Sequence, residues 1–328
     1  MITNKYGIHT FSLKLQYKYS EIQNIIEQNE CIRTSKGKLC LSPYYQITQF
    51  KDIGVEIQLG QSVSHPCWLI LIINPSSLLT GTYKPTALFQ ADKESVQQVK
   101  HHLRNILDKI GVDWRLREFK LSRCDLTCNL YYERKADVQD RLDIFKKSFP
   151  IPHYSAVKFG KHPNSDERFK GANKHSWTIT NKSKSCTFSA YDKTYELEKR
   201  HHIVINEHIL RLELRFGRSK IIKITKVKDW ESQLIEFGSQ VEKQQQKFLH
   251  RLHMMHFDPI PLPELLDRIN ASKYREKTKK KLRRIAKKAN GCVSLAAVQK
   301  DCRIRKSEFI KLLGKFEKMG IGCVSFKQ

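Results

Sequence analysis

Three stretches of the chain carry a tyrosine or a carboxylate on the polar side of an alternating pattern. In LSRCDLTCNL, CTFSAY and ILRLELRF every second residue is apolar, and Asp125, Tyr191 and Glu213 lie at the positions in between. Because successive side chains of a strand point to opposite faces, all three would leave the apolar face. If the polar faces belong to one side of one sheet, the three side chains can converge.

A tyrosine beside two carboxylates has the groups needed for phosphoryl transfer. Two carboxylates with water suit Mg²⁺ or Mn²⁺, which prefer oxygen ligands. Such an ion would polarise a phosphate for attack by a phenolate. Because an ordinary tyrosine has a pKa of about 10, Lys193 and the metal would have to make Tyr191 nucleophilic near neutral pH.

A structural interpretation of the same residues stays open. Tyr191 could be an amphipathic side chain that ends a strand, and Glu213, which lies between Arg211 and Arg215, could form a surface ion pair. Tyr195 lies four residues after Tyr191, so on a helix the two hydroxyls would share a face. Tyr195 is therefore either a second nucleophile or a packing residue.

The elements that would position these residues are mainly strands with a few helices. A helix is expected over 93–111, where apolar residues have helical spacing and Gly111 follows them. The sequence NKSK, residues 181–184, would join two strands as a hairpin. This mixture predicts an α+β fold, with a mostly antiparallel sheet and flanking helices.

The chain changes character at DPIPLPE, where three prolines favour a domain boundary. We predict a catalytic domain over 1–257, a linker over 258–270 and a C-terminal domain over 271–328. The last region has a net charge of +14, with a basic helix in EKTKKKLRRIAKKANG and two short helices before IGCVSF. This order is typical of a winged helix-turn-helix that binds DNA. A helical lid whose lysines keep it in solution is the alternative.

The whole chain is strongly basic, with 60 lysines and arginines against 33 acids and a formal charge of +27. Such an excess favours a polyanionic partner, with nucleic acid preferred over an anionic membrane. The longest apolar run, CWLILII, is far shorter than the roughly 20 residues of a membrane span, so no membrane partner is expected. The nine scattered cysteines include no C-x-x-C pair, which fits a reducing cytoplasm.

The three motifs resemble those of a known family. SRCDLTCNL, SAYDKTYEL and LRLELRF occur in the order and spacing of rolling-circle replication initiators. The likeness is to filamentous-phage gene-II-type proteins and, more loosely, to plasmid initiators of the Rep_trans type. NPSSLLTG, residues 74–81, is similar to a proline-containing segment of the phage proteins. The resemblance covers about residues 55–220.

The resemblance implies that Tyr191 cuts one DNA strand with help from Lys193, and that Asp125 and Glu213 serve Mg²⁺ or Mn²⁺. It names no third ligand, because Asn129 stands where some plasmid relatives have a second aspartate. The His-x-His pair of the wider nuclease superfamily is absent. Since gene-II-type proteins have one tyrosine in this segment, we interpret Tyr195 as packing, with a second nucleophile as the alternative.

These observations predict a metal-dependent DNA nickase and strand transferase that initiates rolling-circle replication of a phage or plasmid in the bacterial cytoplasm. A 5′-phosphotyrosine would be the intermediate. The origin DNA, single- and double-stranded, would be one partner. A host helicase would have to unwind it, because the chain has no G-x-x-x-x-G-K-[ST] loop. A host DNA polymerase would extend the freed 3′ hydroxyl. The basic residues expected to contact DNA are Arg123, Lys158, Lys161, Lys170, Lys174, Arg305, Lys306, Lys311 and Lys315.

Two other classes of protein compete with this interpretation. A non-catalytic regulator could bind an origin or operator through the C-terminal helices. A tyrosine recombinase has only HHLR, residues 101–104, in its favour, and no tyrosine follows at a suitable distance. Separately, His250, His253 and His256 lie three residues apart and could bind zinc on one helical face, although no cysteine partner is evident.

Overall fold

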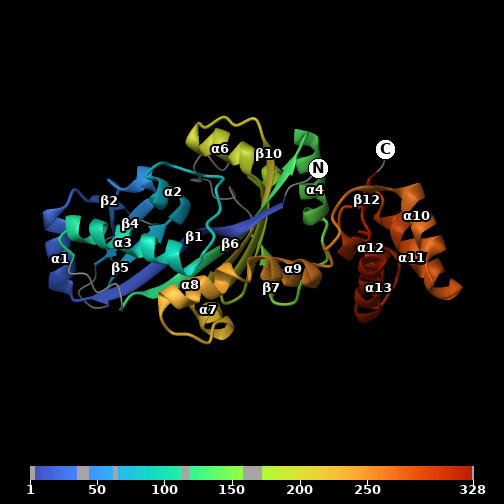
Figure 1. Ribbon diagram of the computed structural model, residues 1–328. Coiled ribbons are helices and arrows are strands. Elements are labelled where there is room, and N and C mark those ends of the chain that lie inside the picture. Colours follow the sequence, from blue (N-terminus) through green and yellow to red (C-terminus); the bar gives the residue numbers. More distant parts are fainter. Residues whose placement is uncertain (1–3, 35–43, 62–65, 113–117, 158–171, 327–328) are drawn as a thin grey trace.

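The computed structural model describes residues 4–34, 44–61, 66–112, 118–157 and 172–326, which form an α+β fold (Figure 1). Within these residues ten strands make one antiparallel sheet in the order β2-β3-β4-β5-β1-β6-β10-β9-β8-β7. The predicted fold class and mostly antiparallel sheet are confirmed. The strands are β1 (Asn4–Tyr17), β2 (Ile32–Thr34), β3 (Tyr44–Ile47), β4 (Val55–Gly60), β5 (Cys67–Ile73), β6 (Lys120–Tyr132), β7 (Tyr154–Ala156), β8 (Ser176–Asn181), β9 (Cys186–Asp192) and β10 (His208–Gly217).

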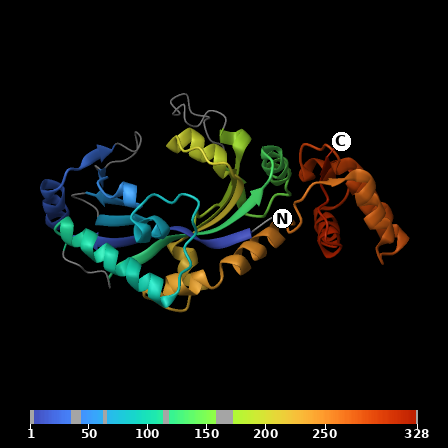
Figure 2. The same ribbon diagram turned by 45° about the horizontal axis from the view of Figure 1, so that its top comes forward.

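The sheet is curved, and helices lie on both of its faces. Figure 2 shows α3 and α8 beneath the outer face, while α6 lies above the inner face. None of the helices in the described residues has the length and apolar character needed to cross a membrane. The helices packed around the sheet are α1 (Tyr19–Gln28), α2 (Pro75–Thr80), α3 (Lys93–Lys109), α4 (Lys135–Lys146), α5 (Ala172–His175), α6 (Lys193–His201), α7 (Arg218–Ile224), α8 (Trp230–Gly238) and α9 (Val241–Leu252), with the short 3₁₀ helix η1 (Lys51–Ile53) before β4.

The apolar residues of the alternating strands form the core between the outer face and the helices. Phe11 of β1 stacks on Trp230 of α8 with ring centroids 6.1 Å apart, and Phe188 of β9 stacks on Phe248 of α9 at 4.9 Å. Burying a large apolar side chain of this kind contributes about 1.5–3 kcal/mol. The other side of each strand is thereby left for the polar residues, as the alternation predicts.

The local turn signals are also confirmed. β8 and β9 form the predicted hairpin, in which Lys184 adopts a positive φ of 54° and its N–H donates to the carbonyl of Asn181 at 2.9 Å. The helix expected over 93–111 is α3, and Gly111 follows it at a φ of 71°, a conformation that glycine adopts without strain.

A β-bulge in β1 changes which side chains reach the inner face. Ile8 pairs with Leu126 and Thr10 pairs with Asp125, so His9 is an extra residue with no counterpart in β6. An extra residue re-aims the side chains beside it. Both His9 and Thr10 therefore reach the inner face, where they line a cavity.

The C-terminal residues form a smaller group of helices beside the sheet (Figure 1). The predicted basic helix and the two short helices after it are present. Part of the predicted linker is α10, which packs against α11. The short strands β11 and β12 pair in parallel, and these features do not confirm the predicted winged arrangement. The elements are β11 (Ile260–Pro261), α10 (Leu262–Ala271), α11 (Glu276–Ala289), α12 (Leu295–Asp301), α13 (Lys306–Lys318) and β12 (Ser325–Phe326).

The helix α13 joins the C-terminal helices to the rest of the protein. The Phe309 ring lies 5.3 Å from that of Phe149, which follows α4. At the other end of α13, Glu317 Oε2 lies 3.1 Å from His250 Nδ1 and 3.4 Å from His253 Nδ1. Aromatic packing at one end and the contacts of Glu317 with two histidines at the other therefore hold this helix in place.

Candidate active site

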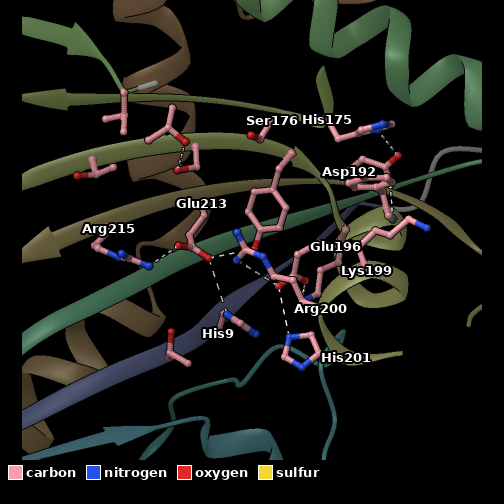
Figure 3. A pocket seen from close by; sticks show the side chains of 18 of the residues that line it. His9, His175, Ser176, Asp192, Glu196, Lys199, Arg200, His201, Glu213 and Arg215 are labelled. Atoms are coloured by element: carbon pink, nitrogen blue, oxygen red, sulfur yellow. Dashed lines mark hydrogen bonds and ion pairs between the residues drawn. The ribbon is translucent and has the colours of Figure 1, made fainter. Parts of the chain in front are cut away.

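The inner face of the sheet borders a cavity of about 710 Å³ between β1, β8, β9, β10 and α6 (Figure 3). Strand and helix side chains both line it, and many of them are charged. The charged residues that the chemistry below depends on are Lys193, Glu196, Lys199, Arg200, Glu213 and Arg215.

The structure brings the predicted nucleophile and one predicted carboxylate together. Arg211 of β10 lies opposite Tyr191 in β9 and opposite Asn129 in β6, so the polar faces of the three strands lie on one side. Tyr191 Oη donates a hydrogen bond of 3.3 Å to Glu213 Oε2. The convergence expected from the alternation is therefore present for this pair.

The second predicted carboxylate, Asp125, is enclosed by donors. Arg215 donates through Nε to Asp125 Oδ1 at 3.0 Å and through Nη2 to Glu213 Oε1 at 2.9 Å, so it joins the two carboxylates. Arg123 donates to Oδ1 at 2.9 Å, and Thr10 Oγ1 donates to Oδ2 at 2.7 Å. Burial raises the pKa of Asp125, but Arg215 and Arg123 outweigh it and hold the pKa below its usual range.

This arrangement does not fit the metal site that the resemblance implies. A ligand to Mg²⁺ must offer a carboxylate oxygen to the ion, whereas both oxygens of the buried Asp125 accept hydrogen bonds from arginines. Glu213 Oε2 lies 3.8 Å from His9 Nδ1, which gives two potential ligands. No group of three or more His, Cys, Asp or Glu side chains in the described part of the chain could hold a metal ion.

The surroundings of Tyr191 keep its hydroxyl protonated. Burial and the carboxylate of Glu213 raise the pKa of Tyr191 well above its usual value, and Arg211 opposes them only in part. At neutral pH the phenol therefore needs a base before it can attack. Glu213, which already accepts its hydrogen bond, is placed to take the proton.

Lys193 lies at the start of α6, where Asp192 caps the helix by accepting a hydrogen bond from the Tyr195 N–H at 2.9 Å. Lys193 is 2% exposed, and its Nζ lies 2.6 Å from Glu196 Oε2. Burial and Arg211 lower the pKa of Lys193 to about 8, although Glu196 raises it. A lysine with this pKa can lose its proton during a reaction near neutral pH.

The second tyrosine of the segment packs against a histidine. The ring of Tyr195 stacks on that of His175, with centroids 3.6 Å apart and planes 11° apart, and His175 Nδ1 lies 3.7 Å from Asp192 Oδ2. Tyr195 also borders the cavity. Its interpretation as a packing residue, with a second nucleophile as the alternative, stays a prediction.

Several residues that line the cavity were not predicted from the sequence. Glu196 contacts Lys193 and also lies 3.5 Å from His201 Nε2. The spacing of three between Lys193 and Glu196 on a helix was a usable signal. His9 had no local signal, because its position depends on the bulge against β6.

The basic residues predicted to contact DNA near the cavity have different surroundings. Arg123 lines the cavity. Lys174 is exposed in α5, and its carbonyl accepts a hydrogen bond from a neighbouring lysine at 2.6 Å. Lys158, Lys161 and Lys170 lie outside the described residues.

The predicted DNA contacts at α13 also differ from one another. Arg305 and Lys311 are exposed. Lys306 and Lys315 lie over aromatic rings, 5.9 Å and 4.2 Å from the centroids. Half of this predicted set is therefore engaged by neighbouring side chains.

Two of the three histidines that were considered as zinc ligands contact a carboxylate of α13 instead. His250 and His253 both face the carboxylate of Glu317 on α13. Within the described ranges, His250, His253 and His256 belong to no group of three or more His, Cys, Asp or Glu side chains that could hold a metal ion. The contact with Glu317 therefore accounts for two of the three side chains.

The fold and the cavity define an α+β protein in which a tyrosine, a carboxylate and several cations face one another. The chain matches no protein-family model, and no curated protein matches it significantly. The function must therefore be inferred from the cavity residues and from the motifs in the sequence.

Proposed function

We propose that this protein is a DNA strand transferase that nicks and rejoins one strand at a replication origin through a 5′-phosphotyrosine at Tyr191. The observation that carries the proposal is the hydrogen bond from Tyr191 to Glu213 inside a cavity lined by cations. The motif resemblance supports rolling-circle initiation on a phage or plasmid. Origin DNA, a host helicase and a host polymerase are the proposed partners, and the bacterial cytoplasm is the proposed location.

In the first step, Tyr191 Oη forms a bond to phosphorus while the bond from phosphorus to the 3′ oxygen breaks. The phenolic proton passes to Glu213, and the leaving 3′ oxygen takes a proton from Lys193. In the second step, a 3′ hydroxyl attacks the phosphotyrosine and the same protons return. Because the phosphotyrosine ester keeps the energy of the broken bond, no nucleotide cofactor is required.

The cations of the cavity would bind the phosphate. Lys193, Lys199 and Arg200 line it from α6, opposite the strand residues. Charged donors of this kind stabilise the negative charge that develops on the phosphate in the transition state. Arg215 is not counted among these phosphate-binding cations, because its guanidinium donates hydrogen bonds to Asp125 and Glu213 and holds both carboxylates in place.

The Mg²⁺ or Mn²⁺ that the resemblance implies stays a prediction for this protein, and an ion would supply further positive charge at the phosphate. No step above is assigned to it, because Asp125 is engaged by arginines. Cleavage measured in EDTA, and again after Mg²⁺ or Mn²⁺ is added, tests the requirement. Full activity in EDTA would rule it out.

Cleavage is expected to decline as the pH rises through about 8. The reason is that Lys193 must carry a proton for the leaving oxygen, and its pKa is lowered to about 8. Glu196→Gln removes a charge that raises this pKa, so the decline should move to lower pH. Lys193→Arg keeps the positive charge but cannot release its proton, so cleavage should fall by about 10²-fold or more.

Initial rates on a labelled single strand, measured across the pH range for both variants, check this assignment. Glu198→Gln serves as the control, because it removes an exposed carboxylate from the same helix at a position that does not line the cavity. An identical pH profile in the wild type and in Glu196→Gln would assign the alkaline decline to another group.

Supercoiled DNA that spans the coding sequence and its flanks provides the direct test of the proposed function. The expected result is a nicked circle with the protein attached to the new 5′ end, and a phosphotyrosine at Tyr191 in peptide mass spectra. Sequence-specific binding without any nick would instead support the non-catalytic regulator, for which the basic C-terminal helices are the favouring observation.

A further inference from the structure

The basic helix α11 presents a row of cations along one side. Spacings of three or four residues place them on one face of a helix, and all are exposed. We call this row the α11 stripe, and its members are Lys277, Lys280, Arg284, Lys287 and Lys288. The opposite side of α11 is buried, with Leu282, Ile285, Ala286 and Ala289 0% exposed.

The α11 stripe has no partner among the residues that the structure describes. No hydrogen bond or ion pair joins any of its members to another described side chain. Two other cations of α11 do have partners: Lys281 pairs with Glu308 of α13, and Arg283 pairs with Glu276 of α11 itself. The stripe spans eleven residue steps, which is about 16 Å of helix. Like charges this close repel one another, so an anionic partner would stabilise them.

The neighbouring helix α13, on which the sequence placed the DNA contacts, is packed along much of its length. Phe309 contacts Phe149, Glu317 contacts a histidine of α9 and the one that follows this helix, and Glu308 pairs with Lys281 of α11. A recognition helix must instead offer a free face to the groove of DNA. Figure 1 shows α10 and α11 on the side away from the sheet, with α12 and α13 nearer to it.

We propose that the α11 stripe binds the phosphate backbone of duplex DNA. At an axial rise of 3.4 Å per phosphate on one strand, a row of about 16 Å reaches about five phosphates. Contacts to phosphate fix position but read no sequence, so the stripe supplies affinity rather than origin recognition. The choice of DNA as the partner rests on the proposed function, while the location of the surface does not.

An anionic membrane is the other polyanion that a basic helix can bind. Helices that bind membranes place an apolar face in the lipid next to the basic face. In α11 the apolar face is already buried in the protein, because Leu282 and Ile285 are fully covered. The stripe therefore has charge to offer but no apolar surface to insert, which favours DNA.

The test measures binding of the full-length protein to a short labelled duplex of arbitrary sequence at several salt concentrations. The stripe variant combines Lys280→Gln, Arg284→Gln and Lys287→Gln. Each phosphate contact contributes about 0.9 to the slope of log affinity against log salt, so three lost contacts should reduce the slope by about 2.7. Thermal unfolding checks that the variant folds, as expected for exposed positions.

A matched variant controls for the loss of net charge. Lys223→Gln, Lys226→Gln and Lys228→Gln remove three exposed cations at α7 and just after it, and the salt slope should stay close to that of the wild type. An α13 variant with Arg305→Gln and Lys311→Gln should also keep the slope. The proposal is overturned if the stripe variant binds DNA like the matched variant, or if the α13 variant loses as much.

Two further measurements separate this proposal from its neighbours. The stripe variant should still cleave a labelled single strand. If neither the wild type nor any variant cleaves, and DNA binding still depends on the stripe, then the proposed strand-transferase function is wrong and this inference stands. Vesicles of anionic lipid form the second arm. A stripe variant that loses vesicle binding and keeps its DNA binding would overturn the choice of partner.

Discussion

Replacing Tyr191 with phenylalanine is expected to abolish strand cleavage while leaving duplex binding nearly unchanged. The substitution removes one hydroxyl, whose described contact is the 3.3 Å hydrogen bond to Glu213, and keeps the ring in β9. Without the nucleophile no covalent step can occur, so cleavage should fall by at least about a thousandfold. A labelled single strand on a denaturing gel, beside a duplex-binding measurement, gives both quantities.

The matched control for this experiment is Tyr195→Phe, which removes the hydroxyl of the neighbouring tyrosine. Its ring can still stack on His175, so the protein should fold and cleave. Undiminished cleavage by the Tyr191 variant would contradict the assignment. Loss of cleavage in the Tyr195 variant alone would exchange the roles of the two residues.

Replacing Asp125 with alanine is expected to destabilise the fold as well as the site. Removing the buried carboxylate leaves Arg123 and Arg215 without their shared anion. Loss of one member of a buried ion pair costs about 3–5 kcal/mol. Because the two arginine side chains are 29% and 42% exposed, water can replace part of the interaction, so we expect about 2–4 kcal/mol.

Urea unfolding of three proteins separates a structural from a catalytic role for Asp125. Asp125→Asn keeps the shape without the charge and should be intermediate in stability. Glu213→Gln keeps an acceptor for Tyr191 and should change stability least while it slows cleavage. An Asp125→Ala protein as stable as the wild type but inactive would contradict the anchoring role and favour the ligand role expected from the resemblance.

The sequence was sufficient to predict the class of fold and the faces of the strands. Strict alternation around Tyr191 and Glu213 placed apolar residues on the outer face, because a strand with one buried face must alternate. The helix α11 and the hairpin at Lys184 were also predictable, since helical periodicity and turn residues are local signals. The pairing of Tyr191 with Glu213 required only that β9 and β10 be neighbours.

The features of the candidate site that could not be predicted from the sequence depend on contacts between residues that are distant along the chain. The alternation places Asp125 on the polar face but cannot show that Arg215 from another strand and Arg123 occupy both its oxygens. Likewise, the apolar face of α13 was visible, whereas its packing on Phe149 depends on a segment more than a hundred residues earlier. Tertiary contacts of this kind leave no periodic trace in the sequence.

The extra residue at His9 also determines how strand β1 can tolerate changes in its length. Removing a single residue other than His9 or Thr10, which together occupy one pairing position opposite Asp125, would reverse the orientation of the side chains on one side of the cut, and would turn Ile8 or Phe11 toward the inner face. Removing His9 would instead restore continuous pairing with β6, with Ile8 and Phe11 still in the core. The cavity would lose its imidazole and keep Thr10 against Asp125. This position therefore allows the strand to gain or lose a cavity group without rebuilding the sheet.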